Sequence, residues 1–411
     1  MSSTAPARDA ARERLASALG ALHTRVPLGM RLGLDPMRAA CARAGDPERA
    51  FEAVHIGGTN GKGSTCAMVA SMARAAGKRV GLYTSPHLIR FAERIRIDGV
   101  PIGDAALTEA LEEALELGPD LSFFEAATFA AFLAFRRAKV SLAVIEVGIG
   151  GRLDATNVLP SPRCTAVTGV AFDHQDMLGD TLTAIAREKA AIAKPGVPMV
   201  LGPMPEEAHR AATELARSHG ARIVEAGDLP PEVMVGLAGP HQRDNARVAW
   251  TVAGELGLAD EHRARGLSEA RWPGRLEHLA VPEGELAGAW ILDGAHNPDG
   301  ARALAKALAG ERIGAVVFGA LADKAWREML AAIASIPAPR VYVAPGGRAP
   351  AEPELLASVA AGAGASGVGE ALAVARRTAG DRPVVVCGSL YLVGEARARL
   401  LGLAADPIVA L

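Results

Sequence analysis

A glycine-rich segment between a strand and a helix constrains the fold more than any other feature of this sequence. Residues 58–65 read GTNGKGST, and the apolar run 51–56 before them is typical of a buried strand. After the segment, apolar residues recur at helical spacing over 66–76, and the run 79–84 predicts the next strand. A succession of strand, loop, helix and strand is the signature of a parallel sheet in an α/β protein.

The segment 58–65 has the features of a phosphate-binding loop. Its glycines let backbone N–H groups turn toward an anion, and the start of the following helix adds a positive dipole end. Lys62 is suited to reach the β- and γ-phosphates of a nucleotide, and Ser64 or Thr65 lies where a metal ion is held. The strict P-loop pattern is not met, because Ile56 stands at the position of its first glycine. An ordinary βα turn is the alternative, which the lysine and the two hydroxyls disfavour.

Strand and helix patterns alternate in two stretches of the chain. The first continues to about residue 201 and the second begins at about residue 289, whereas the pattern over 225–286 is irregular. We therefore expect two α/β domains, 1–273 and 289–411, joined by a hinge over 274–288. The elements expected after residue 84 are helices at 125–136, 181–194 and 299–308, strands at 141–147, 163–170, 197–201, 289–292, 315–318, 340–344 and 383–387, and a small-residue helix and turn at 357–366.

Composition excludes several classes of protein. The 411 residues carry 44 basic and 46 acidic side chains, a formal net charge of −2, which offers no general field to hold nucleic acid or an anionic membrane. The four cysteines lie far apart without a CxxC pair, as in reduced cytosolic proteins. Residues 1–22 lack the apolar core of a signal peptide. We expect a cytoplasmic monomer that binds neither nucleic acid nor membranes.

Candidate metal ligands follow three of the predicted strands. Glu146 stands late in an apolar strand, where a carboxylate is costly unless it is paired or bound to a metal. His174 follows the strand at 163–170 and could ligate a metal as a neutral imidazole. Ser85 ends the strand at 79–84, on the same sheet edge as Lys62. The alternatives are an ion pair for Glu146, a structural hydrogen bond for His174 and a turn for Ser85.

Lys189 stands in the apolar stripe of its predicted helix. Leu182, Ile185, Lys189 and Ile192 follow one another at helical spacing. Burial lowers the pKa of an amine and so favours its neutral, nucleophilic form. Such an amine can react with CO2 to give a carbamate, an oxygen ligand suited to Mg²⁺. The alternative is a lysine whose ammonium reaches the surface or pairs with a core carboxylate.

Nine ordered segments together resemble the folylpolyglutamate synthase/dihydrofolate synthase family of the Mur ligase superfamily, and they span most of the chain. They are HIGGTNGKGST (55–65), YTSPHLIRFAERIRIDG (83–99), SFFEAATFAAF (122–132), IEVGIGGRLDATN (145–157), FDHQDMLG (172–179), IAREKAAIAK (185–194), GPHQRDNA (239–246), PGRLE (273–277) and DGAHNPDGA (293–301).

The resemblance implies a two-domain Mur-ligase-like α/β fold with an N-terminal P-loop ATPase domain, built on a parallel-rich sheet, and a C-terminal Rossmann-like domain. It implies that Mg²⁺ is bound by Ser85, Glu146 and His174, and that Lys189 carries the carbamate. His296 is implied to lie near the γ-phosphate and, with Lys62, Glu146, His174 and Lys189, to serve catalysis. One or two Mg²⁺ ions and a monovalent cation are the inorganic cofactors to consider. The residues implied to contact ATP are Gly58, Thr59, Asn60, Gly61, Lys62, Gly63, Ser64, Asn245, Arg275 and Asp293.

The resemblance also implies a site for a pterin-bearing acceptor and a reaction. The acceptor segments are Leu32, Gly33, Leu34, Phe123, Phe124, Glu125, Asp154, Ala155 and Thr156. The γ-phosphate of ATP activates the acceptor carboxylate as an acyl phosphate, which the amine of L-glutamate attacks. Expected acceptors are 7,8-dihydropteroate and reduced folates. A monofunctional folylpolyglutamate synthase, a cell-wall Mur ligase and a nucleotide-binding regulator without turnover are the alternatives.

Overall fold

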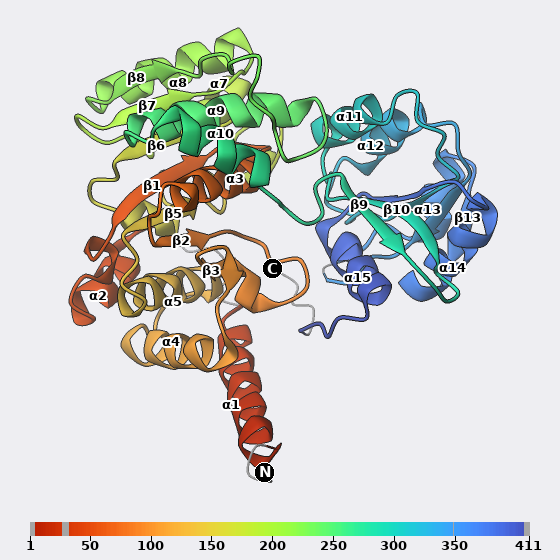
Figure 1. The fold of residues 1–411 in the computed structure, drawn as a ribbon, viewed down its shortest axis with the longest axis horizontal. Coiled ribbons are helices and arrows are strands. Elements are labelled where there is room, and N and C mark those ends of the chain that lie inside the picture. The colour runs from red at the N-terminus through yellow and green to blue at the C-terminus, as the bar shows by residue number, and fades with distance from the viewer. Residues whose placement is uncertain (1–4, 27–32, 348, 407–411) are drawn as a thin grey trace. The chain divides into compact units, whose positions relative to one another are not determined.

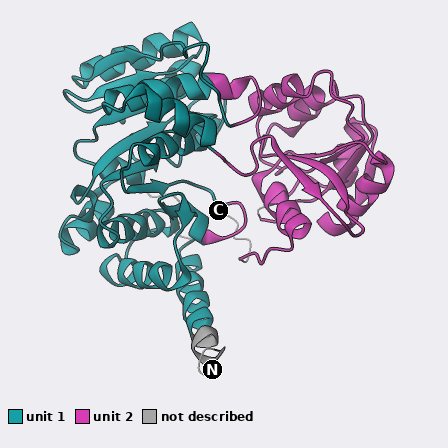
Figure 2. Cartoon of the chain, viewed as in Figure 1, with its two compact units in different colours: residues 1–87, 92–236, 244–270 teal, residues 88–91, 237–243, 271–411 magenta. Residues whose placement is uncertain are grey.

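The computed structural model describes residues 5–26, 33–347 and 349–406. The chain (Figure 1) divides into two compact units, which Figure 2 colours separately. The first unit comprises residues 1–87, 92–236 and 244–270, and the second comprises 88–91, 237–243 and 271–411. Among the described residues, none of the helices has both the length and the apolar character needed to cross a membrane.

The described part of the first unit is built on an eight-stranded sheet with the order β4-β3-β2-β5-β1-β6-β7-β8. Neighbouring strands in the stretch β2-β5-β1-β6-β7-β8 run parallel. At the other edge, β3 pairs antiparallel with both β2 and β4. Buried parallel strands are apolar on both faces, which is why the central strands show no alternation in the sequence. The strands are β1 (Glu52–Gly57), β2 (Val80–Tyr83), β3 (Ile95–Ile97), β4 (Val100–Pro101), β5 (Leu142–Glu146), β6 (Cys164–Val167), β7 (Pro198–Leu201) and β8 (Arg222–Glu225).

Small residues let the helices of this unit approach their neighbours closely. A Cβ on Gly81 of β2 would lie 2.7 Å from the ring of Phe135 in α5, and one on Gly266 of α10 would lie 2.3 Å from Met72 of α3. The helices are α1 (Ala5–His23), α2 (Asp35–Arg43), α3 (Lys62–Ala75), α4 (Asp104–Leu117), α5 (Phe123–Arg137), α6 (Gln175–Leu178), α7 (Leu182–Ala190), α8 (Glu206–Ser218), α9 (His241–Glu255) and α10 (Asp260–Glu269), with short 3₁₀ helices η2 (Pro47–Arg49), η3 (Phe91–Arg94) and η4 (Ala155–Val158).

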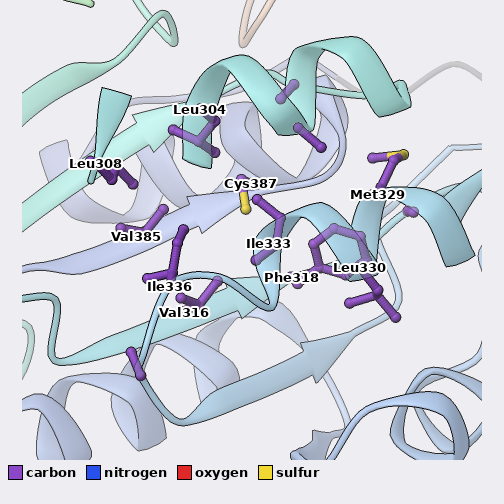
Figure 3. Close-up of a cluster of buried hydrophobic side chains, with 14 of the residues drawn as sticks. Leu304, Leu308, Val316, Phe318, Met329, Leu330, Ile333, Ile336, Val385 and Cys387 are labelled. Atoms are coloured by element: carbon purple, nitrogen blue, oxygen red, sulfur yellow. The ribbon is translucent and has the colours of Figure 1, made fainter. Parts of the chain in front are cut away.

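The described part of the second unit is a six-stranded sheet with the order β13-β12-β11-β14-β10-β9, in which only β9 runs antiparallel. One face packs against α11 and α12 through Leu304, Phe318, Leu330 and Ile333 (Figure 3). The other face carries a second apolar cluster that includes Trp290. The elements are β9 (Glu277–Val281), β10 (Gly288–Asp293), α11 (Pro298–Ala307), β11 (Ala315–Phe318), α12 (Trp326–Ile333), β12 (Arg340–Val343), α13 (Pro353–Val359), β13 (Ala363–Ala365), α14 (Val368–Ala379), β14 (Val384–Cys387) and α15 (Leu390–Leu401).

Two expectations about secondary structure are wrong. The stretch 225–286 is not irregular, because it contains α9, α10 and β9; the apolar face of α9 consists largely of alanine and valine and gives a weak periodic signal. The stretch 357–366 is not a helix and turn throughout, because residues 363–365 form β13 beside β12. Alanine and glycine have little intrinsic preference for strands, so pairing with β12 decides this conformation. The range 274–288 contains β9, which pairs with β10, and its role as a hinge stays a prediction.

Candidate active site

The phosphate-loop segment follows β1 and is held by the segment that follows β6. Thr59 donates its backbone N–H to the oxygen of Gly169 at 2.8 Å, and its hydroxyl exchanges hydrogen bonds with the backbone of Ala171. The hydroxyl of Thr168 donates to the oxygen of Asn60 at 2.6 Å. Gly58 has a φ of 140°, and a Cβ there would lie 2.1 Å from the Thr168 hydroxyl. Only glycine fits this position without displacing Thr168, the residue after β6.

The polar side chains of Lys62 and Ser64 lie at the start of α3, directly after the loop turns at Gly61. Gly61 has a φ of 83° and immediately precedes Lys62, the first residue of the helix. The Lys62 ammonium donates to the oxygen of Thr59 at 3.1 Å and so folds back over the loop. Ser64 is 1% exposed, and its hydroxyl has no hydrogen-bond partner among the described residues. A buried hydroxyl without a partner is uncommon and fits a ligand such as a metal ion or a phosphate oxygen.

Asn245 of α9 lies against this loop. A Cβ on Gly61 would come within 2.0 Å of the Asn245 side-chain oxygen, and Thr65 places its hydroxyl 3.5 Å from the Asn245 backbone oxygen. Two segments 180 residues apart in the sequence are therefore brought together. A contact of Asn245 with ATP stays a prediction.

Glu146 and Ser85 meet at the carboxyl edge of the sheet. Glu146 ends β5, is 5% exposed, and accepts the backbone N–H of Ser85 at 3.1 Å. Its partner in register is Ile56 of β1, two residues before the phosphate loop. The negative charge of Glu146 also contributes, after burial, to raising the pKa of the Cys66 thiol in α3. A buried carboxylate and serine hydroxyls are hard oxygen donors, which fit Mg²⁺.

Lys189 is buried beneath the same loop. Its ammonium donates to the oxygen of Gly58 at 3.1 Å, and the side chain is 4% exposed. Burial first, and then the positive charge of Lys62, lower the pKa of Lys189 to about 7. A substantial neutral fraction is therefore present near neutral pH, which is the form that can react with CO2.

His174 lies on the segment after β6, with a φ of 50° at the start of α6. Its ring nitrogen Nε2 is 3.8 Å from a carboxylate oxygen of Asp173. No group of three or more His, Cys, Asp or Glu side chains in the described chain is arranged to hold a metal ion. The predicted set relies instead on one carboxylate, one imidazole, a hydroxyl and a modified lysine, and it stays a prediction.

Two of the three segments predicted to bind the acceptor, residues 123–125 and 154–156, lie close together. Both α2 and α5 contact η4. A Cβ on Gly148 would lie 2.5 Å from the Phe124 ring and 3.0 Å from the Asp154 carboxylate, so these side chains are close neighbours. The Phe123 ring stacks on His23, with 5.9 Å between centroids, and the Arg94 guanidinium lies 5.4 Å from its centre.

The remaining residues predicted to bind the acceptor lie at the start of helices or in η4, except Leu32. Glu125 accepts hydrogen bonds from the backbone and hydroxyl of Ser122 and thereby caps the start of α5. Gly33 and Leu34 immediately precede α2, and Ala155 and Thr156 are buried in η4. Leu32 lies outside the described residues.

The second unit brings its own predicted residues together. Asp293 ends β10, is 6% exposed, and accepts the backbone N–H groups of Leu276 and Ala295 at 2.8 and 2.9 Å. Burial raises the pKa of Asp293, and the positive charge of Arg275 opposes the rise. Nδ1 of His296 lies 2.8 Å from the oxygen of Gly294. The motifs PGRLE and DGAHNPDGA thus form one cluster within this unit.

The sequence did not single out two residues that hold the site. Thr168 supports the phosphate loop through its hydroxyl, yet a threonine at the end of a strand carries no distinguishing pattern. His55 lies inside the first resembling motif and is fully buried in β1. A titratable ring in an otherwise apolar strand is a signal that could have identified it.

Comparisons with known proteins define the class. Residues 56–198 match the Mur ligase middle domain, and residues 274–390 match the Mur ligase glutamate ligase domain. The chain is therefore a ligase of the Mur type. It is 37% identical, over 77% of its length and 81% of the relative, to the dihydrofolate synthase/folylpolyglutamate synthase of Bacillus subtilis. We conclude that the chain belongs to the folylpolyglutamate synthase/dihydrofolate synthase family of the Mur ligase superfamily.

Solved structures agree with this assignment. E. coli FolC in complex with DHPP and ADP superimposes with a TM-score of 0.85 at 29% identity, over 94% of this chain and 98% of that one. The bifunctional folylpolyglutamate synthase/dihydrofolate synthase of Yersinia pestis, complexed with AMPPNP and a Mn ion, gives 0.84 at 32% identity over the same shares. The two-domain Mur-ligase-like α/β fold is thus confirmed.

Proposed function

We propose that this chain is an ATP-dependent carboxylate–amine ligase that joins L-glutamate to 7,8-dihydropteroate and to the glutamyl carboxylate of reduced folates. The observation that carries this proposal is the proximity of Lys189 to the phosphate loop, through its hydrogen bond to Gly58. The family assignment supports the substrate class. We further propose that ranges 1–273 and 289–411 act as its two domains, and that the enzyme works as a cytoplasmic monomer.

The phosphate loop positions the nucleotide. Backbone N–H groups at the start of α3 face the phosphates, and the Lys62 ammonium offsets the charge that spreads over the transferring phosphoryl group. Arg275, Asp293 and His296 belong to the second unit, and their contact with ATP is part of the same proposal.

Mg²⁺, when bound, neutralises charge on the phosphate oxygens. Ser64, Ser85, Glu146 and His174 would hold it. Lys189 would add a further anionic ligand: its neutral amine forms a bond to the carbon of CO2 and releases a proton, leaving a carbamate. Because the carbamate would bind the same Mg²⁺ through oxygen, this modification of Lys189 is part of the same proposal.

A free carboxylate is a poor electrophile, and the phosphorylated acceptor is a good one. The amine of L-glutamate attacks the acyl phosphate, and the tetrahedral intermediate collapses to an amide and phosphate. No nucleophilic side chain is required, so the protein contributes positioning and electrostatic stabilisation. The rings of Phe123 and Phe124 are suited to a flat pterin.

The test is incorporation of labelled L-glutamate with ATP and Mg²⁺ into 7,8-dihydropteroate and, separately, into tetrahydrofolate, with Lys62→Ala as the inactive control. Product from both acceptors supports the bifunctional proposal. Product from tetrahydrofolate alone favours a monofunctional folylpolyglutamate synthase. Product from neither contradicts the proposal and directs the assay to cell-wall precursors.

A further inference from the structure

A chain of buried hydrogen bonds connects β1 to the turn at residues 154–157. Nε2 of His55 lies 2.7 Å from the hydroxyl of Thr156, and this hydroxyl donates to the carboxylate of Asp154. His55 and Thr156 are both fully buried. His55 stands three residues before Gly58 in the strand that leads into the phosphate loop.

The surroundings of Asp154 determine which group donates in each of these hydrogen bonds. One carboxylate oxygen accepts the N–H and the hydroxyl of Thr156, and the other accepts the N–H groups of Gly148 and Ile149 at 2.9 and 3.1 Å. Burial raises the pKa of Asp154, and the four hydrogen bonds oppose that rise, because an ionised carboxylate can accept all four donated hydrogens. The Thr156 hydroxyl therefore gives its only hydrogen to Asp154 and must accept one from His55.

His55 is thus the neutral tautomer with its hydrogen on Nε2. Its other nitrogen, Nδ1, has no hydrogen-bond partner among the described residues. Burial, aided by the positive charge of Lys194, lowers the pKa of His55 to about 3, which keeps the ring neutral at physiological pH. Within the described part of the chain, the imidazole makes one hydrogen bond, to Thr156.

The turn held in this way is the centre of the predicted acceptor site. Asp154 caps η4, against which both α2 and α5 pack, and its carboxylate is a close neighbour of the Phe124 ring across Gly148. The far end of the turn is held by Lys194, which donates to the backbone and side-chain oxygens of Asn157 at 3.2 and 2.9 Å. Within this turn, both Asp154 and His55 hold the hydroxyl of Thr156.

We propose that His55 is a positioning residue for the acceptor substrate: its Nε2–H fixes the Thr156 hydroxyl and, through it, the Asp154 turn against which the acceptor binds. This inference rests on the proposed function for the identity of the acceptor. The placement of the turn by His55 does not depend on that identity and can be measured separately.

The experiment uses the full chain with four single variants and one double variant. His55→Leu removes the donor, His55→Gln restores one at the position of Nε2, and Thr156→Val removes the acceptor. Thr165→Val is the matched control, because Thr165 is the β6 partner of His55 in register, is fully buried, and among the described residues its hydroxyl donates only to the backbone oxygen of Pro198. The double variant combines His55→Leu with Thr156→Val.

The first measurement is hydrogen exchange of a peptide covering 148–158, which needs no substrate. We expect faster exchange in His55→Leu, recovery in His55→Gln, and no change in Thr165→Val. The second measurement is steady-state kinetics. We expect the KM for the acceptor to rise about five- to tenfold in His55→Leu, with the KM for ATP within about twofold of wild type. The double variant should be no worse than Thr156→Val, because without the hydroxyl His55 has no group to position.

The outcomes separate this inference from the proposed function. Unchanged exchange over 148–158, or equal rises in both KM values, would overturn the positioning role even if wild type forms the amide. A wild-type enzyme that forms no product with either acceptor contradicts the proposed function. In that case, unchanged exchange in His55→Leu still overturns the placement of the turn, and faster exchange supports it. If His55→Leu does not fold, exchange in Thr156→Val is compared with that in Thr165→Val, and unchanged exchange over 148–158 in Thr156→Val would overturn the placement of the turn.

Discussion

The side-chain oxygen of Asn245 lies where a side chain on Gly61 would have to begin. A Cβ at Gly61 would come within 2.0 Å of this oxygen, and the backbone there has a φ of 83°. Gly61→Ala must therefore displace Asn245 as well as strain the backbone. We expect a rise in the KM for ATP on the order of tenfold and a loss of stability of about 1–3 kcal/mol.

Gly77→Ala is the control for this change. Gly77 has a φ of 77°, close to that of Gly61, but a Cβ there would have nothing within 4 Å. It should lose only the ~1 kcal/mol that a left-handed backbone costs and keep the wild-type KM for ATP. Thermal unfolding and initial rates measure both effects. Identical kinetics in the two variants would show that Asn245 has no role at the loop.

Ser64→Ala should separate activity from stability. The Ser64 hydroxyl is buried without a hydrogen-bond partner among the described residues, so removing it should leave the free energy of unfolding within about 1 kcal/mol of wild type, or raise it. Turnover should fall, because the loop loses an oxygen suited to the metal or the phosphates. Denaturant unfolding and the dependence of the rate on Mg²⁺ concentration are the measurements.

Ser122→Ala is the comparison variant that should lose stability, because the Ser122 hydroxyl donates a hydrogen bond to Glu125 at the start of α5. It should lose about 1 kcal/mol. A Ser64→Ala enzyme that is less stable than wild type by this amount and fully active would contradict the role given to Ser64.

Lys189→Ala should lose most of the activity. The buried amine is held beneath the phosphate loop by its bond to Gly58, with a pKa lowered to about 7. If its carbamate is the functional group, short carboxylates added to the assay should partly restore turnover, because they can supply the missing oxygen ligand. Turnover equal to wild type without such additions would rule out the carbamate. Mass spectrometry of the intact wild type under CO2 provides an independent measurement.

His55 should make stability depend on pH. Its pKa is about 3 in the fold and near 6.5 in the unfolded chain, so between these values the unfolded state binds more protons. The stability contribution is complete above pH 6.5 and is lost as the pH falls toward 3. The loss between pH 6.5 and 4 is at most about 3 kcal/mol. His55→Gln should show a shallower fall than wild type in denaturant unfolding over this range, and equal slopes would contradict the prediction.

The pattern of apolar residues along the sequence was sufficient to predict many of the strands and helices. Buried parallel strands are continuous apolar runs, and the central strands β1, β5 and β6 lie where those runs predicted them. The pattern failed at α9, whose apolar face consists largely of alanine and valine, and at β13, whose alanine and glycine residues form a strand because they pair with β12. The predicted helix at 181–194 ends at Ala190, four residues early.

By itself the sequence determined the chemistry available at the sheet edge: a glycine-rich loop with Lys62, a strand ending in Glu146, and Lys189 in an apolar stripe. Residue type and periodicity encode these features, because each depends on residues close in the chain. The contacts of Gly61 with Asn245, of Lys189 with Gly58, and of His55 with Thr156 join segments about 100 to 180 residues apart. Strand order sets these distances, and strand order follows from packing the whole sheet, so only the tertiary structure decided them.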